Sequence, residues 1–289
     1  MFDSTWSAGG LIKEIVQTMQ VEIGTVDTKR FSMDYCSFGT GKRTLVILPG
    51  LSVQSVMLLA SAIAEAYKLL AGDFTIYVFD RRKGVLPDTY TIRDMAVDTA
   101  AAMEALGLKH VEIFGASQGG MMAMEIAVIH PELVHSLILG SSSGCVDSDR
   151  LWLFDHWIAL AKADKATELY LSFGEAVYPK DVFEGAKDAL IEASRTVTEA
   201  ELARFVVLAG SIKSFDLADK LDTITCPVLV IGSRTDAVLG GRASEEIADA
   251  LKNSADCQLY LYDGYGHAAY DCAPDYRERM LRFLREHEQ

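Results

Sequence analysis

Paired cysteines are missing from this sequence of 289 residues. The five cysteines are an odd number, and no two of them have the CxxC spacing of a zinc or redox motif. They are Cys36, Cys145, Cys226, Cys257 and Cys272. Free thiols suit a reducing compartment. We therefore expect a cytoplasmic protein without a metal site.

Positive charge and long apolar runs are also scarce. Lys and Arg number 27 against 41 Asp and Glu, which gives a formal net charge of −14 at pH 7. Such an acidic surface repels nucleic acids and anionic membranes, so neither is expected as a partner. The most apolar stretch, residues 45–70, is interrupted by Pro49, Gly50 and Glu65 and predicts no membrane span. The first fifteen residues lack a basic segment followed by an apolar run, which predicts no signal peptide.

Apolar residues make up 50% of the chain, which is enough for one large domain with a buried core. Six short runs have the continuous apolar pattern of strands that are covered on both faces, as in a parallel sheet. They span residues 44–50, 74–80, 111–117, 136–142, 226–233 and 257–264. Residues 21–26 and 31–39 flank a polar link and predict an antiparallel hairpin at one sheet edge.

Helical patterns alternate with these runs. They cover residues 52–70, 91–108, 118–134, 243–253 and 274–287. Ser52 and Thr91 are the expected N-caps of the first two. This alternation predicts an α/β fold with a mostly parallel central sheet flanked by helices.

One stretch breaks the alternation. Residues 147–215 show helical patterns and no convincing strand, so we expect a helical cap inserted into a core domain formed by residues 1–146 and 216–289. The cap is rich in aromatic residues, most of which we expect to pack the cap helices, while a few line a pocket between cap and core. They are Trp152, Phe154, Trp157, Tyr170, Phe173, Tyr178 and Phe183.

The sequence GASQGG, residues 115–120, places a serine among residues with very small side chains. The run VEIFGAS predicts a strand that leads into Ser117, and QGGMMAMEIA predicts a helix that leaves it. A serine at a strand-to-helix junction, with Gly115 and Gly119 on either side, is the G-x-S-x-G nucleophile elbow. The sharp turn projects the hydroxyl over the sheet edge. We interpret Ser117 as a nucleophile, in preference to a residue of an ordinary glycine-rich loop.

A serine hydroxyl is a weak nucleophile, so it needs a base and an acid that orients the base, in the chain order Ser, Asp or Glu, His. His267 lies in a glycine-bearing loop after the last predicted strand, where functional residues concentrate in α/β sheets. The other histidines flank helix ends or strand starts, or lie in the cap or the C-terminal tail. They are His110, His130, His135, His156 and His287.

Asp236 is the expected acid, because it lies in the loop beyond the strand at residues 226–233. Asp80 precedes Ser117 in the chain, and an ion pair with Arg81 or Arg82 explains its presence. The remaining competitors are Asp147, Asp263 and Asp271, of which the last two are close to His267 in sequence.

Two backbone N–H groups are needed to bind the developing oxyanion. Gln118, the residue after the nucleophile, supplies one candidate. Leu51 supplies the other, since it follows the strand at residues 44–50 and Gly50 lets the backbone approach closely. The alternative interpretation is that Pro49 and Gly50 form a simple turn.

With these motifs in this order, the chain resembles the α/β-hydrolase superfamily, specifically its capped, serine esterase-like group. GASQGG matches the elbow, LPGLS the oxyanion loop, GSRTD the acid loop and GYGHAAY the histidine loop, and the likeness extends over nearly the whole chain. The resemblance implies the α/β-hydrolase fold. Pro49 stands where relatives often have His, and Gln118 where they often have Met. Neither departure removes a backbone donor, but both leave the substrate open.

The prediction is a serine hydrolase for a carboxylic ester or related small acyl substrate, acting without cofactor as a monomer or homodimer. Alternatives on the same scaffold are a proline-type aminopeptidase, a C–C bond hydrolase, an acyltransferase and a perhydrolase. An aminopeptidase needs cap carboxylates to hold a free amine, for which Glu168, Glu175 and Glu184 are available. A ligand receptor that retains the triad without turnover is the alternative from another class.

Overall fold

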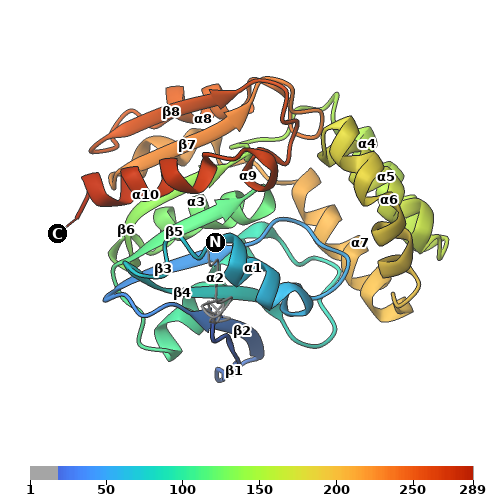
Figure 1. The fold of residues 1–289 in the computed structure, drawn as a ribbon, viewed down its shortest axis with the longest axis horizontal. Helices are drawn as coiled ribbons and strands as arrows, with labels where there is room; N and C mark the ends of the chain where they lie inside the picture. The colour runs from blue at the N-terminus through green and yellow to red at the C-terminus, as the bar shows by residue number, and fades with distance from the viewer. Residues whose placement is uncertain (1–18, 289) are drawn as a thin grey trace, which may run out of the picture.

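The predicted strands form one sheet in the computed structural model, which describes residues 19–288 (Figure 1). The strand order is β1-β2-β4-β3-β5-β6-β7-β8. The strands are β1 (Glu22–Asp27), β2 (Ser32–Phe38), β3 (Arg43–Leu48), β4 (Phe74–Arg82), β5 (Val111–Ala116), β6 (Val134–Gly140), β7 (Val228–Ser233) and β8 (Cys257–Tyr262). The first fifteen residues, for which no signal peptide is predicted, lie outside the described residues.

The sheet is mostly parallel, as the continuous apolar runs predict. β1 pairs with β2 and β2 with β4 in antiparallel fashion, while all pairings from β4 through β3 to β8 are parallel. The predicted hairpin at the sheet edge is therefore confirmed. Parallel strands direct their carboxyl ends to one edge of the sheet, and this edge is where the candidate site lies.

Helices cover both faces of the sheet. The core helices are α1 (Ala60–Ala66), α2 (Ile92–Ala105), α3 (Gln118–Ile129), α8 (Ala243–Ala250), α9 (Ala269–Cys272) and α10 (Tyr276–Glu286). Helices α1, α9 and α10 lie on the face turned toward the viewer in Figure 1, and α2, α3 and α8 lie behind it. Along β3, Val46 and Leu48 pack into one cluster and Leu45 and Ile47 into the other, as the two-residue period of a strand requires.

The helix starts follow local capping chemistry. Thr91 caps α2 with a full capping box, in which its side chain and that of Asp94 bind each other's backbone amides. The predicted helix over residues 52–70 is wrong in its first turn. Ser52 stays in a loop, and Ser55 caps a 3₁₀-helix, Val56–Leu59, by accepting a hydrogen bond from the amide of Met57.

Four helices lie between β6 and β7 in the chain, within the predicted cap. They are α4 (Leu151–Lys162), α5 (Ala166–Val177), α6 (Lys180–Ser194) and α7 (Glu199–Lys213). Helix α4 packs on α7 and α5 on α6. The two ends of this insertion lie side by side, because Cys145 and Asp216 form an isolated antiparallel bridge.

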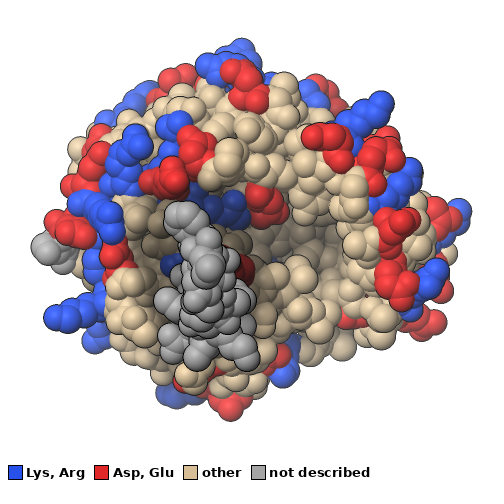
Figure 2. Space-filling model, viewed as in Figure 1, with Lys and Arg blue, Asp and Glu red and all other residues tan. Residues whose placement is uncertain are grey.

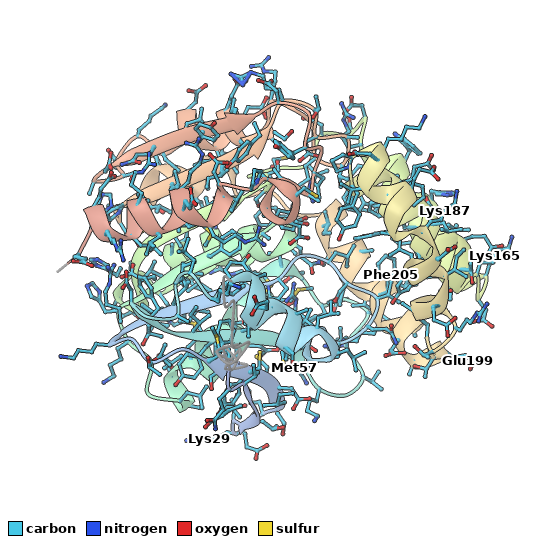
Figure 3. All side chains as sticks on the ribbon, in the orientation of Figure 1. Lys29, Met57, Lys165, Lys187, Glu199 and Phe205 are labelled. Carbon is cyan, nitrogen blue, oxygen red and sulfur yellow. The ribbon has the colours of Figure 1, made fainter. Side chains whose placement is uncertain are left out.

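The cap aromatics divide into three groups. Phe154, Trp157 and Phe183 are buried, as expected of residues that hold the helices together. Trp152 is instead 64% exposed and is not one of the packing residues. Tyr170, Phe173 and Tyr178 line a cavity between α5 and the core. Figure 3 shows Phe205 of α7 pointing inward, whereas Lys165, Lys187 and Glu199 point away from the cap.

None of the helices in residues 19–288 combines the length and the apolar character that a bilayer span requires.

Candidate active site

Ser117 stands at the turn between β5 and α3 in a strained backbone conformation. Its φ is 53° and its ψ is −119°, a region that residues with a side chain rarely adopt. The amide of Ser117 donates to the carbonyl of Gly140 at 2.8 Å, which fixes the turn against the end of β6. Strain of this kind persists only where the surrounding structure enforces it, and it is concentrated at functional sites.

The glycines of the elbow allow close backbone contacts. A Cβ atom added to Gly119 would lie 1.9 Å from the carbonyl oxygen of Leu48, and one added to Gly115 would lie 2.4 Å from the carbonyl oxygen of Gly119. Real Cβ atoms do not approach backbone so closely. The steric interpretation of the sequence GASQGG is therefore confirmed at both positions.

Asp236 and His267 form a buried pair. Nδ1 of His267 lies 2.8 Å from Oδ2 of Asp236, and the two residues are only 2% and 6% exposed. The other carboxylate oxygen, Oδ1, accepts hydrogen bonds from the amides of Val238 at 2.8 Å and Leu239 at 3.0 Å. The acid is thus held by its own loop, and it in turn orients the imidazole so that Nε2 is available for proton transfer.

The three predicted triad residues follow β5, β7 and β8, which end at the same edge of the sheet. The structure joins His267 to Asp236 directly. Within residues 19–288 it records no hydrogen bond between the hydroxyl of Ser117 and His267. Such contacts are often long in the free state of an enzyme and tighten when substrate binds.

The predicted oxyanion loop passes directly over the serine. A Cβ atom added to Gly50 would lie 3.3 Å from Cβ of Ser117, which is a tight contact that glycine avoids. Gln118 begins α3 on the other side of Ser117, and the first amides of a helix have no acceptor within the helix. Gln118 and the residue before Leu51 are therefore both next to Ser117.

Sequence reasoning missed Arg81, a buried cation behind this loop. Its Nη2 donates to the carbonyl of Pro49 at 2.8 Å and to Oε1 of Gln118 at 3.0 Å. Burial lowers the pKa of Arg81 to about 10, so the guanidinium remains charged at neutral pH. Nε2 of Gln118 donates to the carbonyl of Leu208 at 2.8 Å, and this bond links the site to α7 of the cap.

The expected ion pair between Asp80 and a neighbouring arginine is wrong. Oδ2 of Asp80 accepts from the hydroxyl of Ser55 at 2.5 Å, and Oδ1 accepts from the backbone amide of Arg81 at 2.7 Å. The side chain of Arg81 turns to the oxyanion loop instead, and Nη1 of Arg82 lies 3.5 Å from Asp98. Asp80 therefore anchors the start of the helical segment after the loop.

A cavity of about 440 Å³ adjoins the site. Its wall includes Gly50, Leu51 and Ala116, which lie directly beside the serine or its oxyanion loop, and also Tyr270 and Asp271 of α9. The ring of Tyr270 meets that of His267 edge to face, with 6.1 Å between centroids. In Figure 2 the surface is hollowed where the cap helices meet the core, and the visible walls are mostly tan.

The remaining candidates lie apart from the pair formed by Asp236 and His267. Asp147 and Asp263 are exposed. The other histidines contact Glu132, one another or Asp256, or are exposed on α4. In the part of the chain that the structure describes, no group of three or more His, Cys, Asp or Glu side chains is arranged to hold a metal ion.

Comparison with known proteins adds independent observations. A family model described as "alpha/beta hydrolase fold" matches residues 43–274. A protein of Pseudomonas syringae pv. syringae named "Putative carbamate hydrolase RutD" is 28% identical over 229 residues, covering 76% of this chain and 86% of that protein.

Solved structures share the fold. The hydrolase MGS-M2 from a Medee basin deep-sea metagenome superposes with a TM-score of 0.79 at 20% identity, covering 90% of this chain and 97% of that one. The enol-lactonase of Burkholderia xenovorans LB400 gives a TM-score of 0.77 at 17% identity, covering 91% and 100%. At these identities the likeness is one of fold alone.

Proposed function

Because the chain belongs to the alpha/beta hydrolase fold family, we propose that it is a serine hydrolase. Its proposed substrate is a carboxylic ester or a related small acyl compound, which it cleaves through an acyl-enzyme intermediate. The observation that carries the proposal is the buried 2.8 Å contact between His267 and Asp236, next to a strained serine elbow.

In the proposed mechanism, Oγ of Ser117 attacks the carbonyl carbon while Nε2 of His267 takes the hydroxyl proton. Asp236 holds the ring through Nδ1 and stabilises the imidazolium that forms. His267 then returns the proton to the leaving group, which departs and leaves an acyl group on the serine. A water molecule, deprotonated by the same imidazole, releases the acid.

The backbone amides of Leu51 and Gln118 are the proposed oxyanion donors. Arg81 contacts both sides of this hole. One guanidinium nitrogen donates to the carbonyl of Gly50 at 3.4 Å, which belongs to the same peptide group as the Leu51 amide, and also to the side chain of Gln118 at 3.0 Å. A peptide group bound through its carbonyl is restrained from rotating, so we assign Arg81 the role of a positioning residue. Donors fixed before the reaction stabilise charge more effectively than donors that must reorient.

The names of the curated relatives favour a second candidate, a carbamate hydrolase. The same serine chemistry would cleave a carbamate. A carbamate anion, however, needs a counter-charge, and the described wall of the cavity contains no Lys or Arg. A neutral ester therefore fits this cavity better than a small anion does.

The aminopeptidase alternative loses support in the cap. Glu168, Glu175 and Glu184 are all exposed, and none is part of the described wall of the cavity. Glu168 and Glu184 each lie within 4 Å of a lysine on their own helix or at its start. They are solvated surface carboxylates and are not arranged to hold a substrate amine.

Labelling with a fluorophosphonate tests the proposal. We expect the wild-type protein to be modified at Ser117 and the Ser117→Ala variant to remain unlabelled and without esterase activity. Ser148→Ala is the matched control, since Ser148 is an exposed serine next to the cap. Labelling that persists in Ser117→Ala, or that never occurs in the wild type, contradicts the assignment.

A further inference from the structure

The cavity beside the nucleophile has an unusual charge composition. Its described wall is built from apolar and neutral polar residues and contains one ionisable acid, Asp271. The aliphatic part comes from the loop before α1 and from α5 and α6, including Val53, Val177 and Leu190. A wall of this kind binds apolar groups through burial of their surface.

The carboxylate of Asp271 is weakly partnered. Its nearest cation is Nη2 of Arg277, 3.8 Å from Oδ1, which is beyond hydrogen-bond distance. The guanidinium of Arg277 is itself stacked over the ring of Tyr67 at 5.0 Å. Among residues 19–288, no hydrogen bond to either carboxylate oxygen is recorded. The negative charge of Asp271 can therefore act electrostatically on a molecule bound in the cavity.

Asp271 lies where the protein interior meets the open part of the cavity. Burial raises the pKa of its carboxyl above the ordinary value, against the opposing effects of Arg277 and His267, because the negative form is poorly solvated there. The side chain is still 47% accessible, and because Asp271 is part of the cavity wall, an occupant can approach it. A second negative charge in the same cavity would be unfavourable, since it would lie close to a carboxylate that no recorded hydrogen bond neutralises.

The size of the cavity sets the length of the occupant. At roughly 30 Å³ for each water-sized group, a cavity of about 440 Å³ holds on the order of ten non-hydrogen atoms. Leu58 and Leu59 of the wall are 70% and 59% exposed, so the apolar lining continues to the outer surface. A medium-length acyl chain beyond the scissile carbonyl fits these dimensions.

We propose that this cavity selects uncharged, apolar acyl groups of medium length, and that Asp271 is the residue that excludes anionic ones. The proposal rests on the proposed function, since it takes the cavity as the acyl site of the serine hydrolase. It goes further by assigning a substrate class and a specificity-determining residue. Each additional CH₂ buried in the wall is expected to raise kcat/KM by about fourfold until the cavity is full.

The test compares two esters with the same six-carbon chain, p-nitrophenyl hexanoate and the p-nitrophenyl monoester of adipic acid, at pH 8. The second ester ends in a carboxylate. We expect wild-type kcat/KM to be at least about tenfold higher for hexanoate. Asp271→Asn should bring the two values together by raising kcat/KM for the adipate monoester relative to that for hexanoate. Asp263→Asn is the matched control, because Asp263 is an exposed carboxylate eight residues earlier in the chain, after β8, and lies outside the described wall.

Two outcomes overturn the proposal. One is an adipate monoester that the wild type cleaves as well as hexanoate. The other is a hexanoate preference that Asp271→Asn leaves unchanged or that Asp263→Asn removes equally.

A separate binding experiment distinguishes this proposal from the proposed function. If no ester is cleaved, the serine hydrolase assignment fails, but the cavity still has a measurable preference. Calorimetry with hexanamide and with the monoamide of adipic acid then gives the same comparison without turnover. Equal affinities, or tighter binding of the anion, contradict the charge selection by Asp271.

Discussion

At the scale of single residues, the site contains a buried cation, Arg81, whose side chain donates to three neutral oxygens. Arg81 is 5% exposed, and its Nη2 holds the carbonyl of Pro49 and the side chain of Gln118. Its Nε has no hydrogen-bond partner within residues 19–288. A buried charge is unfavourable unless it is well paired, so this arrangement points to a role beyond stability.

Replacement of Arg81 is expected to slow catalysis more than it weakens substrate binding. Arg81→Met should lower kcat by about tenfold to a hundredfold with a small change in KM, because both oxyanion donors lose their support. The kcat of Arg81→Lys should lie between those of the wild type and Arg81→Met, since a single ammonium lacks the planar fork of the guanidinium. Initial rates measured over a range of ester concentrations give both kcat and KM.

Arg82→Met is the control for this prediction. Arg82 is the next residue in the chain, and its side chain turns to Asp98 and to the ring of Phe31. We expect this variant to melt at a lower temperature and to retain its kcat. An Arg81→Met protein that folds and has the wild-type kcat would exclude a positioning role for Arg81.

Candidate residues can be proposed from the sequence where the expected role depends on local structure. Ser117 is proposed from its neighbours, and Asp236 and His267 from their position after strands, and the structure brings these last two into contact. Arg81 was not identified, because the direction of a long side chain depends on packing from distant parts of the chain. The sequence neighbourhood suggested a pair with Asp80, whereas the structure turns Arg81 toward a loop thirty residues earlier.

At the scale of elements, the turn from β5 into α3 positions Ser117, the proposed nucleophile. The turn brings α3 so close to the end of β3 that Gly119 has no room for a side chain. Gly185 gives a natural comparison. It lies within α6, is exposed, and has no atom within 4 Å of an added Cβ.

Gly119→Ala and Gly185→Ala are therefore expected to change stability in opposite directions. The first should lower the free energy of unfolding by about 1–3 kcal/mol or more, because a Cβ 1.9 Å from the carbonyl of Leu48 forces the backbone apart. The second should raise it by about 0.5–1 kcal/mol, since alanine is the better helix former. Urea unfolding followed by circular dichroism measures both changes. A stable Gly119→Ala protein with full activity would contradict the steric account of the elbow.

Element types were predicted more reliably than element ends. In place of the helix predicted over residues 52–70, the structure has a 3₁₀-helix that begins at Val56 and an α-helix, Ala60–Ala66, because Ser55 and not Ser52 meets the amide of Met57. Both serines are followed by apolar residues, so the sequence does not distinguish the two caps. Ser52 instead donates to the carbonyl of Gln54 and keeps the preceding loop in the wall of the cavity.

At the scale of the whole molecule, the order of strands in the sheet was beyond the reach of sequence patterns. The apolar runs predict parallel strands, but no local signal places β3 between β4 and β5. That order results from long-range pairing, and it is what brings the ends of β5, β7 and β8 to one edge. The order of the strands could be expected only from the likeness to known hydrolases, whereas the candidate side chains could be proposed from the residues themselves.

The charge of the molecule gives a last prediction. With 27 basic and 41 acidic residues, the net charge is −14, and Figure 2 shows both signs spread over the visible surface. Surface pairs contribute little, while the excess of like charge repels itself at long range. Raising NaCl from 10 to 150 mM shortens the screening length from about 30 Å to about 8 Å, which weakens this repulsion. We expect the melting temperature to rise by about 2–4 °C for each kcal/mol by which the repulsion weakens.

Potassium chloride should give the same result if the effect is one of screening and not of a specific ion. The partly buried pair between Arg43 and Glu112 is screened much less than exposed charges, so its contribution should change little. A melting temperature that falls with added salt would mean that attractive surface pairs outweigh the net charge, contrary to this account.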